Sequence, residues 1–271
     1  MIVQRVPKGT CPIIICNVDH AIAAGQLAEA FGNAQFAQPV AGRLLAFVAR
    51  HHEEGWRPLD ARPRRNPATG LPYHLAETPA ELLIQKSVVS PDFNEHHHPW
   101  CGLLSSMHSW GLYHQRYGIS DAVSIEQRPP AYAGAIARML EGELIRQERL
   151  RALLRSDPAT APWVEEEVLM TSYKLLEFFD TLALWWQLTH PSLRKPARFP
   201  HVPAAIGQDL SLDIVPMGSH RARLTPYPFA QSPLVLGCRV RSVRPAAREA
   251  DFAAAIAAGV TSWQHYELSA E

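Results

Sequence analysis

The chain has 271 residues, of which 47% are hydrophobic and 19% are charged, and its formal net charge at pH 7 is zero. This size and composition predict a globular protein with one large domain, or one domain with a smaller appendage. The balanced charge gives no overall electrostatic footprint for nucleic acid or an anionic membrane, so we expect neither as a partner.

The four cysteines and the apolar segments bear on the cellular compartment in which the protein is expected. No two cysteines form a CxxC pair, and the N-terminus lacks the charge and apolar run of a signal peptide. The most apolar stretch, at 175–188, contains two acids and is too short to cross a bilayer. We therefore expect a cytoplasmic protein with reduced thiols.

Apolar spacing and helix-ending residues predict a mostly helical region over roughly the first 190 residues. A short strand is expected at 11–16, and a long loop rich in Pro and Arg at 56–80. Long ordered loops in compact domains are often functional. The expected helices cover 19–31, 40–54, 79–90, 99–117, 127–156 and 162–189.

The pattern changes to alternating apolar and polar residues near the C-terminus, which is typical of strands. The alternating stretches are 210–217, 219–229 and 234–243. The sequence therefore predicts a mainly α protein in which residues 1–195 form a helical domain. Residues 196–271 would form a small antiparallel β appendage packed on it.

Several predicted helices carry a polar side chain on the face that should be buried. His20 lies in the first turn of the first helix, and His52, with Glu53 beside it, follows the apolar stripe of the second. His108 and Asp180 have the same spacing to apolar residues in two later helices. Inward imidazole and carboxylate groups from separate helices suit a transition metal, and they favour Fe, Mn, Zn or Ni over Ca.

Each of these residues also has a simpler interpretation. A single histidine on an apolar face is usually a hydrogen-bonded core residue, and an inward aspartate often binds a nearby loop. Spacing along separate helices does not by itself show that the four side chains converge.

Several blocks of sequence resemble an uncharacterised bacterial family, domain-of-unknown-function family 3891. They occur in order over residues 3–245, and the most specific are "HHEEGW" and "FFDTLAL". The family in turn is similar to the HD superfamily of helical, metal-dependent phosphohydrolases, so the resemblance implies an HD-like helical bundle.

The resemblance also implies a ligand set. The superfamily uses a histidine, a His-Asp pair on the next helix and a late aspartate, which would here be His20, the pair His52–Glu53, and Asp180. His108 falls where some members have an additional ligand for a second metal. The pair is His-Glu here rather than His-Asp, which departs from the pattern of the superfamily.

The implied reaction is hydrolysis of a phosphate ester or a nucleotide-like small molecule by metal-activated water, with one or two ions. Glu53 and Asp180 would be the catalytic carboxylates, and no organic cofactor is expected. Residues of the 56–80 loop would bind the substrate: the guanidinium groups would receive phosphate oxygens, and the aromatic rings would line the pocket. These candidates are Trp56, Arg62, Arg64 and Tyr73. Lys86, Arg116 and Lys174 are weaker candidates.

Two other functions stay open. A di-iron oxygenase would need more histidines, and His74, His96, His97, His98 and His114 are available. A non-catalytic binding or regulatory module with a degraded metal site would explain the glutamate in the His-Glu pair. The chain has no P-loop and no GxSxG motif. Apolar helix faces are compatible with a homodimer but do not require one.

Overall fold

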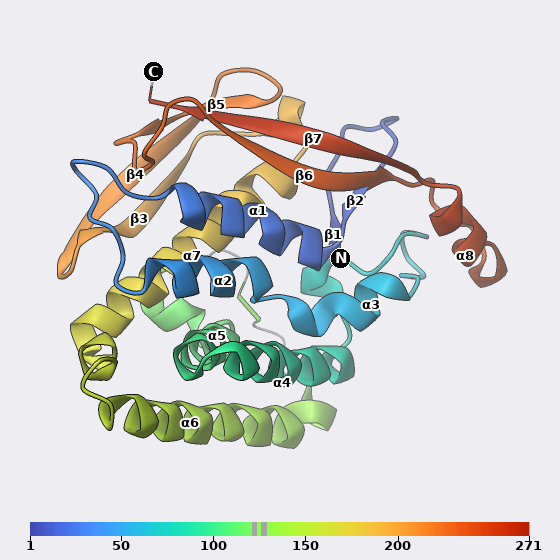
Figure 1. The fold of residues 1–271 in the computed structure, drawn as a ribbon. Coiled ribbons are helices and arrows are strands. Elements are labelled where there is room, and N and C mark those ends of the chain that lie inside the picture. The colour runs from blue at the N-terminus through green and yellow to red at the C-terminus, as the bar shows by residue number, and fades with distance from the viewer. Residues whose placement is uncertain (121–123, 126–128, 271) are drawn as a thin grey trace.

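The computed structural model describes residues 1–120, 124–125 and 129–270. Seven strands form one mixed sheet, and the helices are stacked beneath it (Figure 1). The strands are β1 (Ile2–Val3), β2 (Ile13–Ile15), β3 (Ala197–Ala205), β4 (Gln208–Pro216), β5 (Arg221–Thr225), β6 (Leu234–Ser242) and β7 (Val260–Ser269).

The sheet corrects the predicted fold class. Its order is β1-β2-β6-β7-β5-β4-β3, so it combines strands from both ends of the chain. It is neither small nor purely antiparallel, since β5 pairs with β7 in parallel. The prediction of a mainly α, HD-like bundle with a small antiparallel appendage is therefore wrong, and so is the all-α class.

Long-range pairing builds the centre of the sheet. β2 pairs with β6 through Ile13 and Ser242, which joins the N-terminal segment to the C-terminal one. β6 and β7 form a long antiparallel pair in which Leu236 lies opposite Tyr266. The short helix α8 (Glu249–Ala257) connects these two strands at one end of the molecule (Figure 1).

β3 is an edge strand, and its sequence explains why. Pro200 and Pro203 lie within it, and proline cannot donate a ladder hydrogen bond, so it is confined to edges and bulges. The register with β4 shifts at both places. Because the prolines interrupt the alternation of apolar and polar residues, the sequence does not predict β3, and the first strand that it predicts in this region begins at residue 210.

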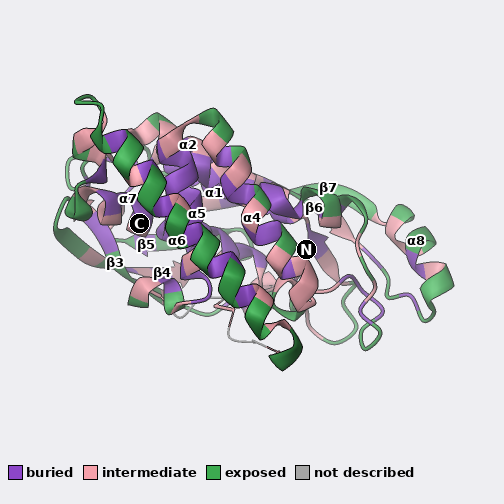
Figure 2. Cartoon of the chain, turned by 90° about the horizontal axis from the view of Figure 1, so that it is seen from below, coloured by how far each residue is buried: buried purple, intermediate pink, exposed green. Residues whose placement is uncertain are grey.

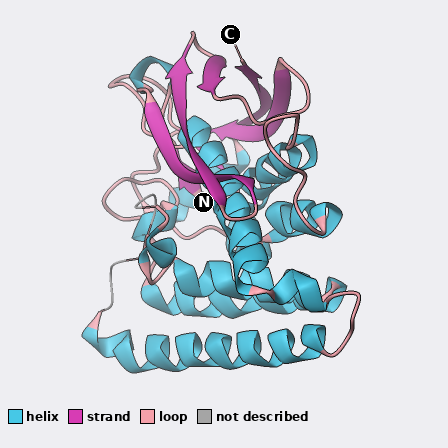
Figure 3. Ribbon diagram, turned by 90° about the vertical axis from the view of Figure 1, so that its left-hand side faces the viewer, coloured by secondary structure: helices cyan, strands magenta, loops and turns pink. Residues whose placement is uncertain are grey.

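The helices form layers under the curved sheet (Figure 3). α1 contacts β6 and α7 contacts β3, and α4, α5 and α6 follow below. The helices are α1 (Asn17–Ala30), α2 (Gly42–His51), α3 (Arg57–Ala61), α4 (Ala80–His97), α5 (Pro99–Gly111), α6 (Ala133–Arg155) and α7 (Glu166–Gln187). The start of the helix expected at 127–156 includes residues 127–128, which lie outside the described residues.

Burial follows from these layers. α6 lies at the outside and buries only one stripe, which includes Ile136, Leu140 and Leu150 (Figure 2). α1 lies between the sheet and the other helices, and its small residues permit close packing. A Cβ at Gly25 would lie 2.7 Å from the Cβ of Arg50, so this glycine allows α2 to approach α1. That approach determines where the end of α2 meets the first turn of α1.

The largest hydrophobic core is continuous between the sheet and the helices. It joins Leu27 of α1 and Phe179 of α7 to Leu212 and Leu236 of the sheet. The expected boundary near residue 195 falls just before β3, and buried residues on both sides of it belong to this core. Across the described parts of the chain, no helix is long and apolar enough to span a membrane.

Candidate metal centre

Three buried histidines from three different helical segments lie close together, with His52 next to both of the others. His20 is in the first turn of α1, His52 is the residue after α2, and His108 is in α5. The ring centroids are 5.5 Å apart for His20 and His52, and 5.0 Å apart for His52 and His108. Each histidine is at most 2% exposed. The convergence that spacing alone could not establish is therefore present.

Each histidine is held by its Nδ1 atom. The Nδ1 of His20 lies 2.6 Å from Oε1 of Gln187, and that of His52 lies 2.8 Å from the carbonyl oxygen of Ala49. The Nδ1 of His108 lies 2.7 Å from a carboxylate oxygen, Oε1 of Glu177. All three partners are acceptors, so Nδ1 carries a proton in each ring and Nε2 faces the centre, where the Nε2 of His20 meets a second acceptor, Oδ1 of Asp180. Metal-ligating histidines are typically oriented in this way.

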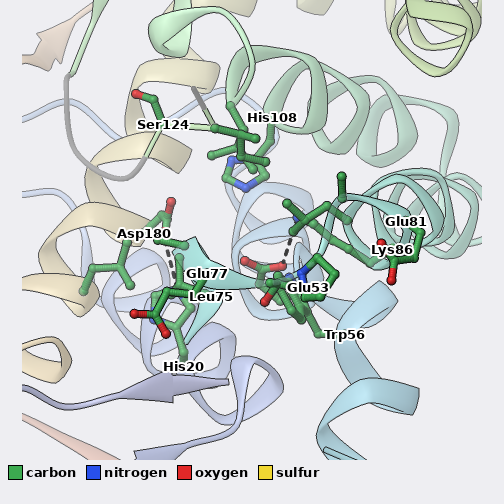
Figure 4. A pocket seen from close by; sticks show the side chains of 18 of the residues that line it. His20, Glu53, Trp56, Leu75, Glu77, Glu81, Lys86, His108, Ser124 and Asp180 are labelled. Carbon is green, nitrogen blue, oxygen red and sulfur yellow. Dashed lines mark hydrogen bonds and ion pairs between the residues drawn. The ribbon is translucent and has the colours of Figure 1, made fainter. Parts of the chain in front are cut away.

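The carboxylates of Asp180 and Glu53 lie beside these Nε2 atoms. Asp180 of α7 places Oδ1 2.9 Å from Nε2 of His20 and 3.7 Å from Nε2 of His52. Figure 4 shows His20 and Asp180 joined on one side of the site, and Glu53 facing Lys86 on the other. The Lys86 Nζ to Glu53 Oε2 distance is 3.9 Å.

Buried atoms without partners point to a missing ligand at this place. Within the described residues, the Nε2 atoms of His52 and His108 and Oε2 of Glu53 have no hydrogen-bond partner. Leaving buried polar atoms unpaired is costly, so each such atom calls for an explanation. A cation bound by these atoms would satisfy all three.

The donor set fits a metal ion. His20, His52 and Asp180 offer atoms within 4.8 Å of one another, as do His52, Glu53 and His108. Metal–nitrogen bonds of 2.0–2.1 Å in a tetrahedron place neighbouring donors about 3.3 Å apart, close to the 3.7 Å between His52 and Asp180. The buried histidine and carboxylate groups could therefore hold a metal ion.

A third group of possible ligands already binds a cationic side chain, that of Arg116. His108, Glu177 and Asp180 also offer donor atoms within 4.8 Å of one another. The buried guanidinium of Arg116 donates from Nη1 to Oε2 of Glu177 and, over 2.8 Å, to Oδ2 of Asp180. Burial alone would raise the pKa of Asp180, but Arg116 and His20 more than offset this effect. The pKa therefore lies well below its usual range, and Asp180 is ionised.

A cavity of about 470 Å³ opens beside the cluster. His20, Glu53, His108 and Asp180 reach it, whereas His52 is not among its lining residues. Apolar side chains form much of the wall, among them Leu75, Pro79, Leu83, Leu112, Ile125 and Leu184. Lys86 and Arg116 contribute positive charge. Four carboxylates also line it, those of Glu53, Glu77, Glu81 and Asp180, so the cavity suits a small molecule with polar groups at this end.

The structure separates the four expected substrate residues. Trp56 is 3% exposed and lines the cavity, where the Nζ of Lys86 lies 5.2 Å from its ring centroid. The other three lie outside the lining of this cavity. Arg62 is exposed, Arg64 forms an ion pair with Glu81 at the surface, and Tyr73 lines a separate small pocket.

The additional histidines considered for a di-iron centre also lie elsewhere. His74 accepts a hydrogen bond from the backbone of Val3, and His114 stacks on Trp110. Among the described residues, the ligand groups do not include these two or the histidines at 96–98.

Three residues of the site were missed or given another role by sequence reasoning. Glu177 and Gln187 lie three residues before and seven after Asp180 on α7, which places them on the same helix face. That spacing was visible in the sequence and could have identified them. Arg116 was expected only as a weak phosphate ligand, and nothing local in the sequence shows that it turns inward.

The fold and the site define a protein with a mixed sheet, layered helices and a buried centre of histidines and carboxylates. The profile of the family described as "Protein of unknown function (DUF3891)" matches residues 1–245, and the chain belongs to this family. No curated protein and no solved structure matches the chain.

Proposed function

We propose that the protein is a metal-dependent hydrolase that acts on a phosphate ester or nucleotide-like small molecule. The observation that carries this proposal is the set of three oriented imidazoles with Asp180 and Glu53 at the wall of a cavity. Such a donor set, open to a cavity on one side, is what catalytic metal sites require. Fe, Mn, Zn and Ni all accept these ligands.

His52 would hold the ion together with His20 and Asp180, and the adjoining group around the same His52 adds His108 of α5 and Glu53. An ion bound there would lower the pKa of a bound water molecule to about 7, which would supply a nucleophile at neutral pH. Gln187, the Ala49 carbonyl and Glu177 hold the three rings in position, so the ligands are oriented before the ion binds.

Glu53 would accept a proton from the attacking water. Its carboxylate lines the cavity, and Oε2 lacks a hydrogen-bond partner among the described residues. Lys86, which is 5% exposed, would bind an anionic oxygen of the substrate. The apolar wall formed by residues such as Leu83 and Leu112 would contact the organic part of the molecule and limit the access of water.

The order of the ligands along the chain adds support, because a histidine, a His-acid pair and a late aspartate is the order that the HD superfamily resemblance implies. The bundle fold that came with this resemblance is wrong, so the proposal depends on the site itself. A cytoplasmic location remains an expectation from the sequence. The only partner that the proposed activity requires is a small-molecule substrate.

A matched pair of variants tests the proposal. The metal-loaded protein would be assayed with p-nitrophenyl phosphate, bis-p-nitrophenyl phosphate and a panel of nucleoside phosphates. Glu53→Gln should keep the metal and lower kcat by about 10²–10⁴-fold, the usual range for loss of a general base. The control is Glu54→Gln, since the neighbouring carboxylate faces His51 and Arg57 instead of the cavity.

Two results would contradict the proposal. The first is a Glu53→Gln enzyme with the full rate. The second is a metal-loaded wild-type protein that cleaves none of these esters, which would favour a binding or regulatory module. Reversible colour change with oxygen in an iron-loaded sample would instead favour the oxygenase.

A further inference from the structure

We propose that Arg116 takes the place of a second metal ion, so that the centre binds one ion per chain. This inference rests on the proposed metal site and decides a question that the site leaves open, its number of ions. Two-metal hydrolases use paired cations to stabilise the attacking and leaving oxygens. Here a guanidinium group would supply the second positive charge.

The two carboxylates of α7 divide their oxygens between separate partners. Oδ1 of Asp180 faces His20 and His52, while Oδ2 lies 2.8 Å from Nη1 of Arg116. Oε1 of Glu177 accepts the Nδ1–H of His108, and Oε2 accepts from the same Nη1. One atom of each carboxylate therefore serves the histidine cluster, and the other serves Arg116.

The groups that contain His20 and Glu53 share His52, whose Nε2 can bind only one ion, so a second ion would need the third group, where Arg116 lies. The group formed by His108, Glu177 and Asp180 has the donors for a cation, and Nη1 already bridges its two carboxylates. The arginine is 1% exposed, so it is enclosed in the same way as a bound ion. A second metal would have to displace it and leave a buried guanidinium without its partners, which is strongly unfavourable.

The backbone of this segment adopts an unusual conformation that brings the side chain inward. Gln115, Arg116 and Tyr117 have positive φ values of 50°, 49° and 56°, and Gly118 follows at 78°. Residues other than glycine rarely adopt this region, and strained backbone tends to occur at functional sites. The ring of Tyr117 packs against Trp110 and Tyr173, which holds the turn in place.

The position of Arg116 also gives it access to substrate. It lines the same cavity as Glu53 and Lys86, on the side of Asp180. A substrate anion at the polar end of the cavity would therefore meet one metal ion and two fixed organic cations. Arginine stays charged and suits phosphate oxygens, so it can stabilise developing negative charge without exchange or loss.

Metal counting on matched variants tests this assignment. The full-length protein would be stripped with chelator and titrated with Mn²⁺. Bound ions per chain would be read by elemental analysis, and electron paramagnetic resonance would separate isolated ions from coupled pairs. Wild type should bind one ion with the spectrum of an isolated centre. Arg116→Met removes the charge at similar length and should bind two, with a coupled spectrum.

The control is Arg146→Met. Arg146 is a partly buried arginine that bridges Glu95 and Glu143, away from the centre. This variant should keep one ion. Adding Glu177→Gln to Arg116→Met should return the count from two to one, because the second ion then lacks a carboxylate.

The outcomes separate the inference from the proposed function. Two ions in wild type, or one ion in a folded Arg116→Met variant, would overturn the assignment of Arg116 while leaving a metal-dependent enzyme intact. No ion in wild type would refute the proposed function itself. If Arg116→Met does not fold, the wild-type count and spectrum still decide, since a coupled pair would contradict the assignment.

Discussion

Replacing Glu177 with glutamine tests whether the surroundings of the histidines control metal binding. Glu177 is 1% exposed, and each of its carboxylate oxygens accepts a hydrogen bond, one from His108 and one from Arg116. Glutamine keeps the shape but has a single acceptor oxygen. Whichever donor meets the new amide N–H loses its partner.

The structure allows two magnitudes to be estimated. Removing one partner of a buried, charged pair typically costs about 3–5 kcal/mol of stability, because the other charge stays buried. Loss of the group that orients a ligating histidine lowers metal affinity by about 10–100-fold. At about 1.4 kcal/mol per tenfold, that is about 1.4–2.8 kcal/mol of binding free energy.

Urea unfolding and competition with a fluorescent chelator measure the two effects separately. Glu143→Gln is the matched control, since Glu143 is a 2% exposed glutamate with an arginine partner 3.1 Å away on α6. The control should lose stability and keep its metal affinity. If Glu177→Gln binds metal within about twofold of wild type, the carboxylate does not orient His108 as a metal ligand.

Three further predictions concern packing, ligand linkage and thiols. A Cβ at Gly55 would lie 2.1 Å from the carbonyl oxygen of Lys86, so Gly55→Ala should cost about 1–3 kcal/mol in urea unfolding. Gly142→Ala, in the interior of α6 and with no atom near its new Cβ, should instead stabilise by about 0.5–1 kcal/mol, and equal effects would contradict the packing argument. Chelation should lower Tm by roughly 5–10 °C, as expected when an ion present at about 100 times its Kd is removed, and an unchanged Tm would count against binding to the folded state. Iodoacetamide at pH 8 should label native protein only at the exposed Cys11, and labelling of all four thiols before unfolding would refute this. Burial raises the pKa of the other three thiols to about 12, those of Cys16, Cys101 and Cys238.

The ligand-bearing helices could be anticipated because their apolar spacing is local. Their ends were less accurate. The helix expected at 40–54 ends at His51, and the backbone then turns so that Gly55 can pack against α4. The helix expected at 99–117 ends at Gly111, and the left-handed residues from Gln115 to Tyr117 would in any case prevent it from reaching Tyr117. Both deviations lie next to the centre, where contacts between segments override local preference.

The sheet could not be read from the sequence in the same way. β1 and β2 are two and three residues long, too short for a pattern, and β2 pairs with a strand more than 200 residues later in the chain. The prolines of β3 conceal an edge strand. Alternation identifies a strand but says nothing about its partner, so the sequence predicts a separate small sheet at the C-terminus where the structure has part of a larger one.

The candidate site was partly predictable for a chemical reason. A histidine or aspartate on an apolar stripe violates the pattern around it, so His20, His52, His108 and Asp180 stood out. Glu177, between Leu176 and Phe178, shares a helix face with Asp180, and this spacing could have identified it too. The inward position of Arg116 depends on positive φ values at three consecutive residues, 115–117. None of these is a residue type that favours positive φ, so the sequence does not predict this turn.

The central claim is that the buried cluster binds a metal ion. Elemental analysis of the purified, untagged protein, reported as metal atoms per chain, tests it most directly, with His52→Ala as the comparison. We predict about one equivalent of iron, manganese, zinc or nickel in wild type and a clear loss in a folded His52→Ala variant. Wild-type protein that holds no metal after incubation with each of these ions, or a variant with unchanged content, would contradict it.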